Sequence, residues 1–401
     1  MKKALVYYLY GNRNAGDMAI CLGTIEFLKK HEYEISMVSR FSESENEYWC
    51  SREYLLKYYP DVKIYPGPFS FERNFSAVKK MFSYTGSMLK VAGIIPDKQT
   101  KQLVGEADDV FFNGGNLLRG AYLTDYMRLT ALFYPVRIAH HMGKPVYCLP
   151  QSTAKISRYG EKILNSCLRC FNKVFIREKI SFDELSKKFP GILFLRSTDM
   201  AFFCGDTETA LKGYLALGIE QKPDTVAVVV RNTGIGDIGE LSIEKQELLK
   251  KKLLAFIREH SDFNYLIVVQ TEKDRAFSDK LYNEIAKLAQ VRIIENHDPL
   301  VLREIYKRTR FLITMRLHAA ILSLSAQTPV VGLFSEEWGL KNPGIMRDYD
   351  MPYIMIENSG EVFPIMPTDI QKASIVSNIC KYAEILNTCL FEKIDISENL
   401  L

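Results

Sequence analysis

The fold is decided by the stretch Phe311-Leu-Ile-Thr-Met-Arg-Leu-His-Ala-Ala-Ile321. Its first four residues form a short apolar run that predicts a β-strand. The small apolar residues from Ala319 to Ala326 predict a packed helix directly after it. Arg316 and His318 therefore lie where a strand is followed by a helix, at the end of an open α/β sheet where ligands bind. An arginine, a histidine and a helix N-terminus together favour an anion such as phosphate or carboxylate.

Strand-like apolar runs alternate with helical patterns from one end of the chain to the other. Strands are expected at residues 3–10, 33–39, 109–112, 145–149, 173–176, 193–195, 225–230, 265–269, 291–294, 310–314 and 330–334. Helices are expected among them at residues 18–30, 124–142, 181–188, 243–260, 275–289 and 299–307. This alternation predicts parallel sheets with helices on both faces.

The chain has 401 residues, too many for one ordinary hydrophobic core, so two domains are expected. The predicted fold class is α/β, with two Rossmann-like domains that face each other across a cleft. The first domain is expected at residues 1–218 and the second at residues 219–368. A final helix within residues 369–401 is expected to cross back to the first domain.

Composition and charge are typical of a soluble cytoplasmic enzyme. Apolar residues make up 47% and charged residues 25% of the chain, and the net charge of +4 is too small to indicate a nucleic-acid partner. No run reaches the roughly 18 apolar residues that span a bilayer. The apolar start of the chain is interrupted at Gly11, which favours a first strand over a signal peptide. Cys167 and Cys170 form a C-x-x-C without a second pair at zinc spacing, so no metal site is expected.

One stretch, residues 69–103, interrupts the alternation of strands and helices. Apolar side chains are interleaved there with six basic ones, Arg73, Lys79, Lys80, Lys90, Lys98 and Lys101. A basic amphipathic insertion of this kind suits peripheral contact with an anionic membrane surface. A solvated pair of helices covering the first sheet explains it equally well, so both interpretations stay open.

Polar residues follow the ends of most predicted strands. The first strand leads into Gly11-Asn-Arg-Asn-Ala-Gly-Asp17, where glycines permit a tight turn and the next helix begins. A helix cap explains Asp17 taken alone, but the loop as a whole gathers several polar groups. It matches neither the dinucleotide-binding nor the P-loop pattern. Further strands are followed by the residues Asn113, Gly114, Gly115, Asn116, Gln151, Ser152, Arg177, Arg231 and Gln270. Turns, caps and surface arginines explain each of these singly, whereas together they would line a cleft with hydrogen-bond donors.

These motifs, in this order, resemble the polysaccharide pyruvyl transferase family over roughly residues 4–340. The resemblance is carried by the Gly16-Asp17 loop, the Gly114-Gly115 turn, Gln151, the Arg177-Glu178 start, Asp199 and, most specifically, Arg316-x-His318. It implies the two-domain GT-B fold and transfer of the enolpyruvyl carbons of phosphoenolpyruvate onto two sugar hydroxyls. It implies neither a metal nor a nucleotide cofactor. The chain departs from the family at Asn116 and Phe334, and Lys341 is the nearest candidate for an expected lysine.

We assign roles on this basis. His318 is expected to be the general acid and Asp17 the general base. Donor binding is expected from Arg316, Leu317, Arg231, Arg177, Gln270 and Lys341, because arginine forks suit phosphate and carboxylate. Acceptor binding is expected from Asn14, Gly16, Asn113, Gly114, Gly115, Asn116, Gln151 and Ser152. The expected acceptor is galactose or an N-acetylhexosamine, within a bacterial capsule or exopolysaccharide repeat unit that a polyprenyl diphosphate lipid could carry.

Two other functions remain open from the residues alone. A GT-B glycosyltransferase would use a nucleotide sugar and would need a carboxylate for the ribose, for which Glu295 and Glu336 are candidates. A non-catalytic component of a polysaccharide assembly complex would lack catalytic residues, whereas the Arg-x-His motif is present here. A histidine at a strand end is also often only structural, but its pairing with Arg316 favours a functional role.

Overall fold

The computed structural model describes residues 1–69, 85–121, 123–231, 241–338, 341–358 and 366–391. The chain forms two compact units. Unit 1 contains Met1–Asn12, Ile20–Phe203 and Ile385–Leu401, and unit 2 contains Arg13–Ala19 and Cys204–Glu384. The junction thus follows Phe203, earlier than the expected boundary at residue 218. Residues 70–84 of the basic amphipathic insertion at residues 69–103 lie outside the described residues.

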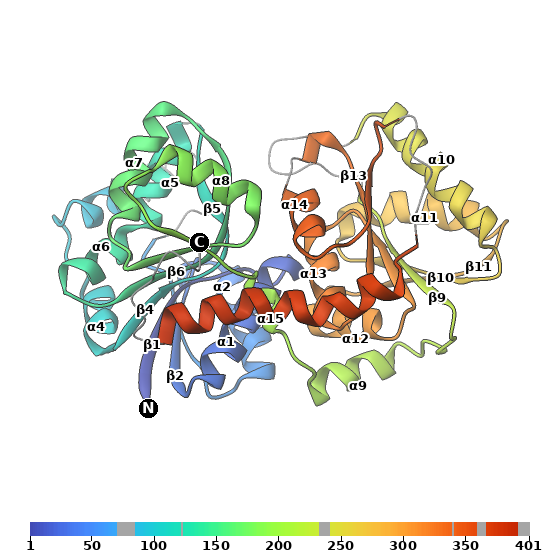
Figure 1. Ribbon diagram of the computed structural model, residues 1–401. Coiled ribbons are helices and arrows are strands. Elements are labelled where there is room, and N and C mark those ends of the chain that lie inside the picture. The colour runs from blue at the N-terminus through green and yellow to red at the C-terminus, as the bar shows by residue number, and fades with distance from the viewer. Residues whose placement is uncertain (70–84, 122, 232–240, 339–340, 359–365, 392–401) are drawn as a thin grey trace. The chain divides into compact units, whose positions relative to one another are not determined.

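Unit 1 is built on a parallel sheet with the strand order β3-β2-β1-β4-β6-β7-β8, to which β5 adds by pairing with β6. The strands are β1 Lys2–Leu9, β2 Tyr33–Ser39, β3 Lys63–Tyr65, β4 Asp109–Phe112, β5 Gly115–Gly120, β6 Val146–Ile156, β7 Lys173–Ile176 and β8 Phe194–Arg196 (Figure 1). All four residues of β4 are buried, as expected for a parallel strand covered on both faces. The short strands β3 and β5 were not predicted.

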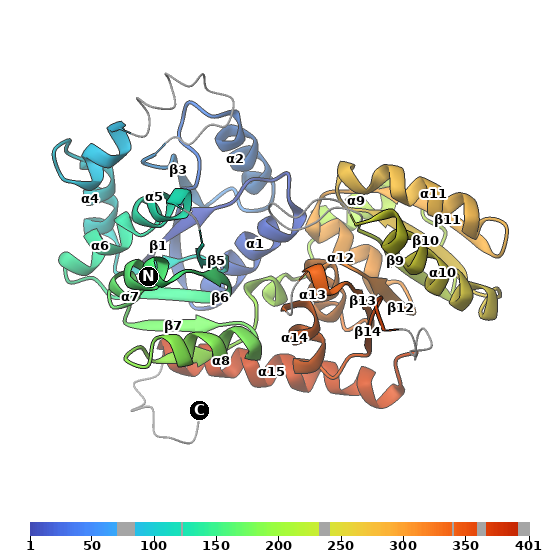
Figure 2. The ribbon, with the colours of Figure 1, turned by 90° about the horizontal axis from the view of Figure 1, so that it is seen from above.

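Helices cover both faces of this sheet (Figure 2). They are α1 Ala15–Lys30, α2 Asn46–Tyr58, α4 Lys98–Glu106, α5 Leu123–Leu132, α6 Tyr134–His141, α7 Arg158–Leu168 and α8 Lys179–Lys188, with a 3-10 turn at η1 Met200–Phe203. The single helix expected at residues 124–142 is two helices that break at Phe133. Pro135 explains the break, because proline is accommodated in the first turn of a helix and not in its interior.

Unit 2 is built on a second parallel sheet with the strand order β11-β10-β9-β12-β13-β14. Its strands are β9 Thr225–Val229, β10 Asn264–Val269, β11 Gln290–Glu295, β12 Phe311–Thr314, β13 Val330–Phe334 and β14 Tyr353–Met355. Numbered within the unit, this is the 3-2-1-4-5-6 order of a Rossmann fold. The prediction of two Rossmann-like α/β domains is confirmed.

The helices of unit 2 are α9 Glu208–Ala216, α10 Ile243–Glu259, α11 Arg275–Ile285, α12 Pro299–Lys307, α13 Leu317–Ser325, α14 Lys341–Asp348 and α15 Asp369–Phe391. Short 3-10 turns occur at η2 Glu272–Asp274 and η3 Glu336–Trp338. From Ile385 onward α15 groups with unit 1. None of the helices in the described part of the chain is long and apolar enough to cross a membrane.

Candidate functional site

The strand order of unit 2 has one switch point, between β9 and β12. Chain connections run in opposite directions from these two neighbours, and ligands of open α/β sheets bind outside the carboxyl ends of such strands. Arg231 follows β9 and Arg316 follows β12 by two residues each. The backbone N–H of Met315 donates to the Val229 carbonyl (3.0 Å), which ties the two strand ends together. Both arginines thus emerge at the switch point.

The guanidinium of Arg316 is held in a fixed orientation by the residues that follow β10. Its Nε donates to Oδ2 of Asp274 (2.8 Å), and its Nη2 donates to the same oxygen and to Oγ1 of Thr271 (3.0 Å). Asp274 is only 1% exposed. Within the described residues Nη1 makes no hydrogen bond, so one edge of the fork remains for a ligand.

Arg231 lies close to the positive charge of Arg316. Burial, and then the nearby positive charge of Arg316, lower the pKa of Arg231 to about 10, although Asp274 acts in the opposite direction. Its guanidinium carbon lies 5.7 Å from the ring centroid of Trp338, within cation–π range. Arg231 and Arg316 thus lie close to the same buried carboxylate, that of Asp274, at the carboxyl edge of this sheet. Neighbouring guanidinium groups of this kind suit an anion.

His318 lies in the first turn of α13, beside the start of α1. A Cβ placed on Gly16 would fall 2.2 Å from Nδ1 of His318. Any residue with a side chain at position 16 would therefore clash with the imidazole. Asn14 orders this turn, because its side chain accepts from the N–H of Gly16 (3.1 Å) and donates to Oδ2 of Asp17 (2.9 Å). The glycine-aspartate loop and the Arg-x-His motif therefore meet within unit 2.

The remaining predicted donor residues have varied surroundings. Leu317 is the first residue of α13, where a backbone N–H has no partner within its own helix. Gln270 is buried, and its amide donates to the hydroxyl of Tyr306. Lys341 is the first residue of α14. Thr271 and Asp274 were not predicted from the sequence. Asp274 is the last residue of η2, five residues after the end of β10, and is therefore not read as a strand-end residue.

Arg177 belongs to a closed network in unit 1. Its Nη1 pairs with Oδ2 of Asp199 (2.5 Å), and its Nε donates to the hydroxyl of Ser152 (2.6 Å). All three side chains are at least 97% buried. The charges of this arginine and this aspartate cancel, so the geometry assigns Arg177 and Ser152 to the core of unit 1 and does not support a role in donor binding.

Asn113 and Gln151 form a similar closed network. The Asn113 amide donates to the Tyr8 carbonyl (3.0 Å), and its Oδ1 accepts from the Thr24 hydroxyl (2.8 Å) and the Gly114 N–H (2.9 Å). The Gln151 amide donates to the Asn113 carbonyl (2.6 Å), and its Oε1 accepts from the Leu117 N–H (3.3 Å). These contacts tie the residues after β4 to β1 and β6, and tie β6 to β5.

The Gly114-Gly115 turn also has a packing role. The Tyr10 hydroxyl donates to the Gly114 carbonyl (2.8 Å), and a Cβ on Gly115 would lie 2.5 Å from that hydroxyl oxygen. Gly115 has φ +139°, which L side chains rarely adopt. The amide oxygen of Asn116 is buried and has no hydrogen-bond partner among the described residues. Of the acceptor residues predicted in unit 1, Asn116 alone is left with an unsatisfied side-chain atom.

Unit 1 contains a small pocket that the sequence did not indicate. It lies at the carboxyl ends of β1 and β2 and is lined by Tyr7, Tyr8, Ser39, Arg40, Pro68, Phe69, Ala131 and Pro135. Tyr8 has φ +80°, and the pairing of β1 with β2 shifts register at this residue. Burial raises the pKa of Tyr8 to about 12, so the phenol stays protonated. Backbone strain at a non-glycine residue is concentrated at ligand sites.

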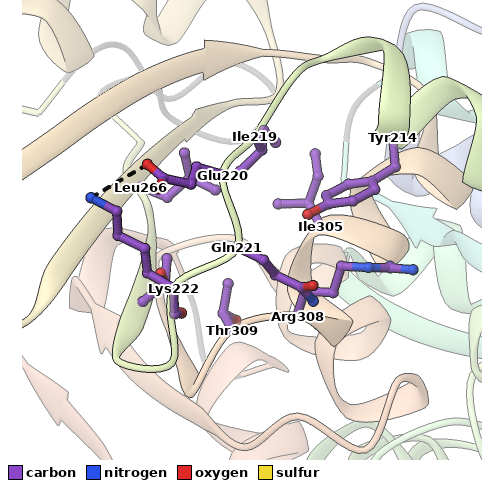
Figure 3. A pocket seen from close by; sticks show the side chains of 10 residues that line it. Tyr214, Ile219, Glu220, Gln221, Lys222, Leu266, Ile305, Arg308 and Thr309 are labelled. Atoms are coloured by element: carbon purple, nitrogen blue, oxygen red, sulfur yellow. Dashed lines mark hydrogen bonds and ion pairs between the residues drawn. The ribbon is translucent and has the colours of Figure 1, made fainter.

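Another pocket lies at the opposite, amino edge of the unit 2 sheet (Figure 3). Its cations are neutralised or covered: Lys222 pairs with Glu220 (3.6 Å), and Arg308 lies 4.3 Å from the ring centroid of Tyr214. Within the described ranges, no three His, Cys, Asp or Glu side chains are placed to hold a metal ion.

The sequence profile of the polysaccharide pyruvyl transferase family matches residues 14–334, well over half of the chain. No curated protein matches this chain. A solved glycosyltransferase from Rickettsia africae ESF-5 is similar, with a TM-score of 0.56 and 14% identity over 96% of each chain. A UDP-GlcNAc 2-epimerase from Neisseria meningitidis, solved bound to UDP-GlcNAc, has a TM-score of 0.55 and 13% identity over 96% of this chain and 94% of that one. At these identities the likeness shows the fold alone, which is the two-domain GT-B type.

Proposed function

Because this chain belongs to the polysaccharide pyruvyl transferase family, we propose that it transfers the enolpyruvyl group of phosphoenolpyruvate to two hydroxyls of a sugar. The product is a cyclic pyruvate ketal, and inorganic phosphate is released. One observation carries the proposal: Arg231 and Arg316 lie together at the switch point of unit 2, and Arg316 lies on the same strand-to-helix segment as His318, with its Nη1 making no hydrogen bond among the described residues. No metal or nucleotide takes part in the proposed reaction.

The guanidinium pair has a direct use in this chemistry. The donor carries a phosphate and a carboxylate, and a dianionic phosphate is matched by two guanidiniums. Asp274 orients Arg316 through Nε and Nη2 and leaves Nη1 for the ligand. Holding the phosphate also stabilises the charge that it carries away when it leaves.

His318 supplies the proton in the proposed mechanism. Protonation of the methylene carbon converts it to a methyl group and leaves cationic character on the carbon that bears the phosphate oxygen. A sugar hydroxyl attacks that carbon, phosphate leaves with its bonding electrons, and a second hydroxyl closes the ketal. Asp17, which groups with unit 2 beside Gly16, is proposed to take up the hydroxyl protons.

The acceptor sugar is proposed to bind unit 1 at the pocket formed by Tyr8 and Arg40. Aromatic side chains offer an apolar face to a sugar ring, and a protonated tyrosine and an arginine can donate hydrogen bonds to its hydroxyls. A galactose or an N-acetylhexosamine of a bacterial capsule or exopolysaccharide repeat unit is the proposed acceptor.

A lipid-linked acceptor would bring the enzyme to a membrane surface, where an exposed segment of unit 1 would help. Ile94 and Ile95 are 69% and 38% exposed, and the exposed Lys98 and Lys101 follow them. Apolar residues beside lysines suit an anionic bilayer. We expect Ile94→Asp to weaken co-sedimentation with vesicles containing anionic lipid while leaving turnover of a soluble acceptor unchanged. Unaltered vesicle binding by this variant would contradict the membrane contact.

The function is tested by phosphorus NMR of the purified protein with phosphoenolpyruvate and a panel of lipid-linked or aryl galactosides and N-acetylhexosaminides. Acceptor-dependent growth of inorganic phosphate, with a product heavier by a pyruvate ketal, would establish the reaction. Ligand-dependent thermal protection provides the second measurement. Protection by a nucleotide sugar and not by phosphoenolpyruvate would overturn the proposal in favour of glycosyl transfer.

A further inference from the structure

Two buried polar side chains after β13 in unit 2 have no hydrogen-bond partner among the described residues. They are the indole Nε1 of Trp338 and both amide atoms of Asn342. Trp338 is 2% exposed and Asn342 is 1% exposed. More than nine in ten buried polar groups in proteins are hydrogen-bonded, and leaving one unpaired costs about 1–3 kcal/mol. Three unsatisfied atoms so close in sequence therefore require an explanation.

Their position in the sheet points to a ligand. Both residues follow the carboxyl end of β13, in η3 and in the first turn of α14. Strand β13 pairs in parallel with β12, whose carboxyl end leads to Arg316, so the two strand ends lie at the same edge. The ring centroid of Trp338 lies 5.7 Å from the guanidinium carbon of Arg231. The unsatisfied indole thus adjoins the charged site.

The chemistry of the unpaired atoms limits what they can bind. An indole N–H only donates a hydrogen bond, and the amide nitrogen of Asn342 is also a donor. Both donors are neutral and match an acceptor-only group of low charge, which a carboxylate is. The amide oxygen of Asn342 only accepts, so it requires a donor other than the carboxylate. The two guanidiniums of Arg231 and Arg316 match the more highly charged phosphate.

We infer that Trp338 and Asn342 bind the carboxylate of the enolpyruvyl donor, while Arg231 and Arg316 bind its phosphate. The inference rests on the proposed function and adds a second half to the donor site. Neutral donors also suit the reaction, because the carbon next to the carboxylate gains cationic character. A carboxylate held by N–H groups keeps more of its negative charge beside that carbon than one paired with an arginine.

The inference is tested by calorimetric titration of the full chain with phosphoenolpyruvate and, separately, with inorganic phosphate. Trp338→Phe removes the N–H and keeps the ring, and Asn342→Leu removes both polar atoms at similar volume. We expect each to weaken phosphoenolpyruvate binding about tenfold and to change phosphate binding less than about twofold. Asn342→Leu should unfold at the same or a higher temperature, because an apolar group then fills a buried site. Trp49→Phe is the matched control, since Trp49 is the chain's other tryptophan and its indole donates to the Glu43 carbonyl (3.0 Å).

The outcomes separate this inference from the proposed function. If the unaltered protein does not bind phosphoenolpyruvate, the proposed function fails. If the unaltered protein binds it and both variants bind it equally well, only the role of Trp338 and Asn342 is overturned. An equal loss of affinity for phosphoenolpyruvate and for phosphate would overturn the assignment to the carboxylate.

Discussion

The two units place polar residues directly after buried parallel strands, but they use them differently. In unit 1, Arg177 is neutralised by Asp199, and the amides of Asn113 and Gln151 are satisfied by their neighbours. In unit 2, Arg316 pairs with Asp274, Arg231 lies close to both, and Nη1 of Arg316 makes no hydrogen bond among the described residues. The same sequence signal thus marks a structural network in unit 1 and the proposed donor site in unit 2. The difference is that the network of unit 1 is closed, whereas one edge of Arg316 remains open to a ligand.

The largest expected effect is on the unit 2 side of this comparison. His318→Ala should lower kcat about 10³-fold, because a positioned general acid contributes roughly 10²–10⁴-fold. The unfolding temperature should stay nearly unchanged. The rate of phosphate release measures kcat, and scanning calorimetry measures the unfolding temperature. His260→Gln is the control, since His260 lies at the C-terminus of α10, before the amino end of β10, and packs on Phe263. Near-normal turnover by His318→Ala would contradict the assignment of His318 as the general acid.

The matching prediction for unit 1 concerns stability. Arg177→Met leaves the Asp199 carboxylate buried without its counter-ion, which should lower the free energy of unfolding by about 3–5 kcal/mol. Urea denaturation measures the loss. Adding Asp199→Leu to this variant should recover part of it, because no unpaired charge then remains. If Arg177→Met kept its stability and lost affinity for phosphoenolpyruvate, Arg177 would be assigned to the donor site. The contrast between the two units would then be wrong.

A smaller effect is expected where α1 meets the Arg-x-His motif. Gly16→Ala would place a methyl group 2.2 Å from Nδ1 of His318, so the imidazole must move. Displacement of a reacting group by about 1 Å costs up to roughly 10²-fold in rate, and we expect a fall in kcat of about 10- to 100-fold. Gly105→Ala in α4 is the control, because its new methyl would meet only Met142 at 3.7 Å and should stabilise the helix slightly. Full activity of Gly16→Ala would contradict the close packing of His318.

The smallest effect concerns an exposed ion-pair cluster in unit 2, which contrasts with the buried pair of unit 1. Partial burial acts to raise the pKa of Asp206, but hydrogen bonds from Lys307 and Arg303 lower it to about 2. In an unfolded chain it would be about 3.9. The stabilisation is therefore present above about pH 4 and is lost as the pH falls towards 2. Because Asp206 is 54% exposed, Asp206→Asn should cost less than about 1 kcal/mol at pH 7 and nothing near pH 2. A larger cost in urea titrations at pH 7 would show that the cluster is not solvent-screened.

Much of the fold could be predicted from the sequence, because buried parallel strands are continuous apolar runs. β2, β4, β7, β13 and α12 begin and end where expected. Strands β3 and β14 have three residues each and are only partly buried, so they lack the apolar run that marks the equally short β8. β5 begins with Gly115-Asn116, which indicates a turn when read locally. Its strand conformation depends on pairing with β6, which the local sequence does not encode.

The candidate site was predicted in part. Arg316 and His318 could be found because they directly follow a strand. Trp338 and Asn342 could not, because a tryptophan and an asparagine beyond a strand end are indistinguishable from ordinary core and cap residues. Their unpaired atoms become evident only when the surrounding side chains are placed. The same holds for Arg177, whose engagement by Asp199 depends on contacts between β7 and the turn after β8.

The return of α15 to unit 1 has a consequence for biosynthesis. His31 stacks on Phe391 with ring centroids 3.9 Å apart and hydrogen-bonds Asn387 (3.0 Å), and Lys173 donates to the carbonyl of Cys389. Domains usually fold as they are translated, the N-terminal one first. Here the ribosome must complete all of unit 2 before the segment that closes unit 1 is made. The nascent chain would therefore expose apolar surface around His31 until late in translation, which makes this surface a place where a chaperone would bind.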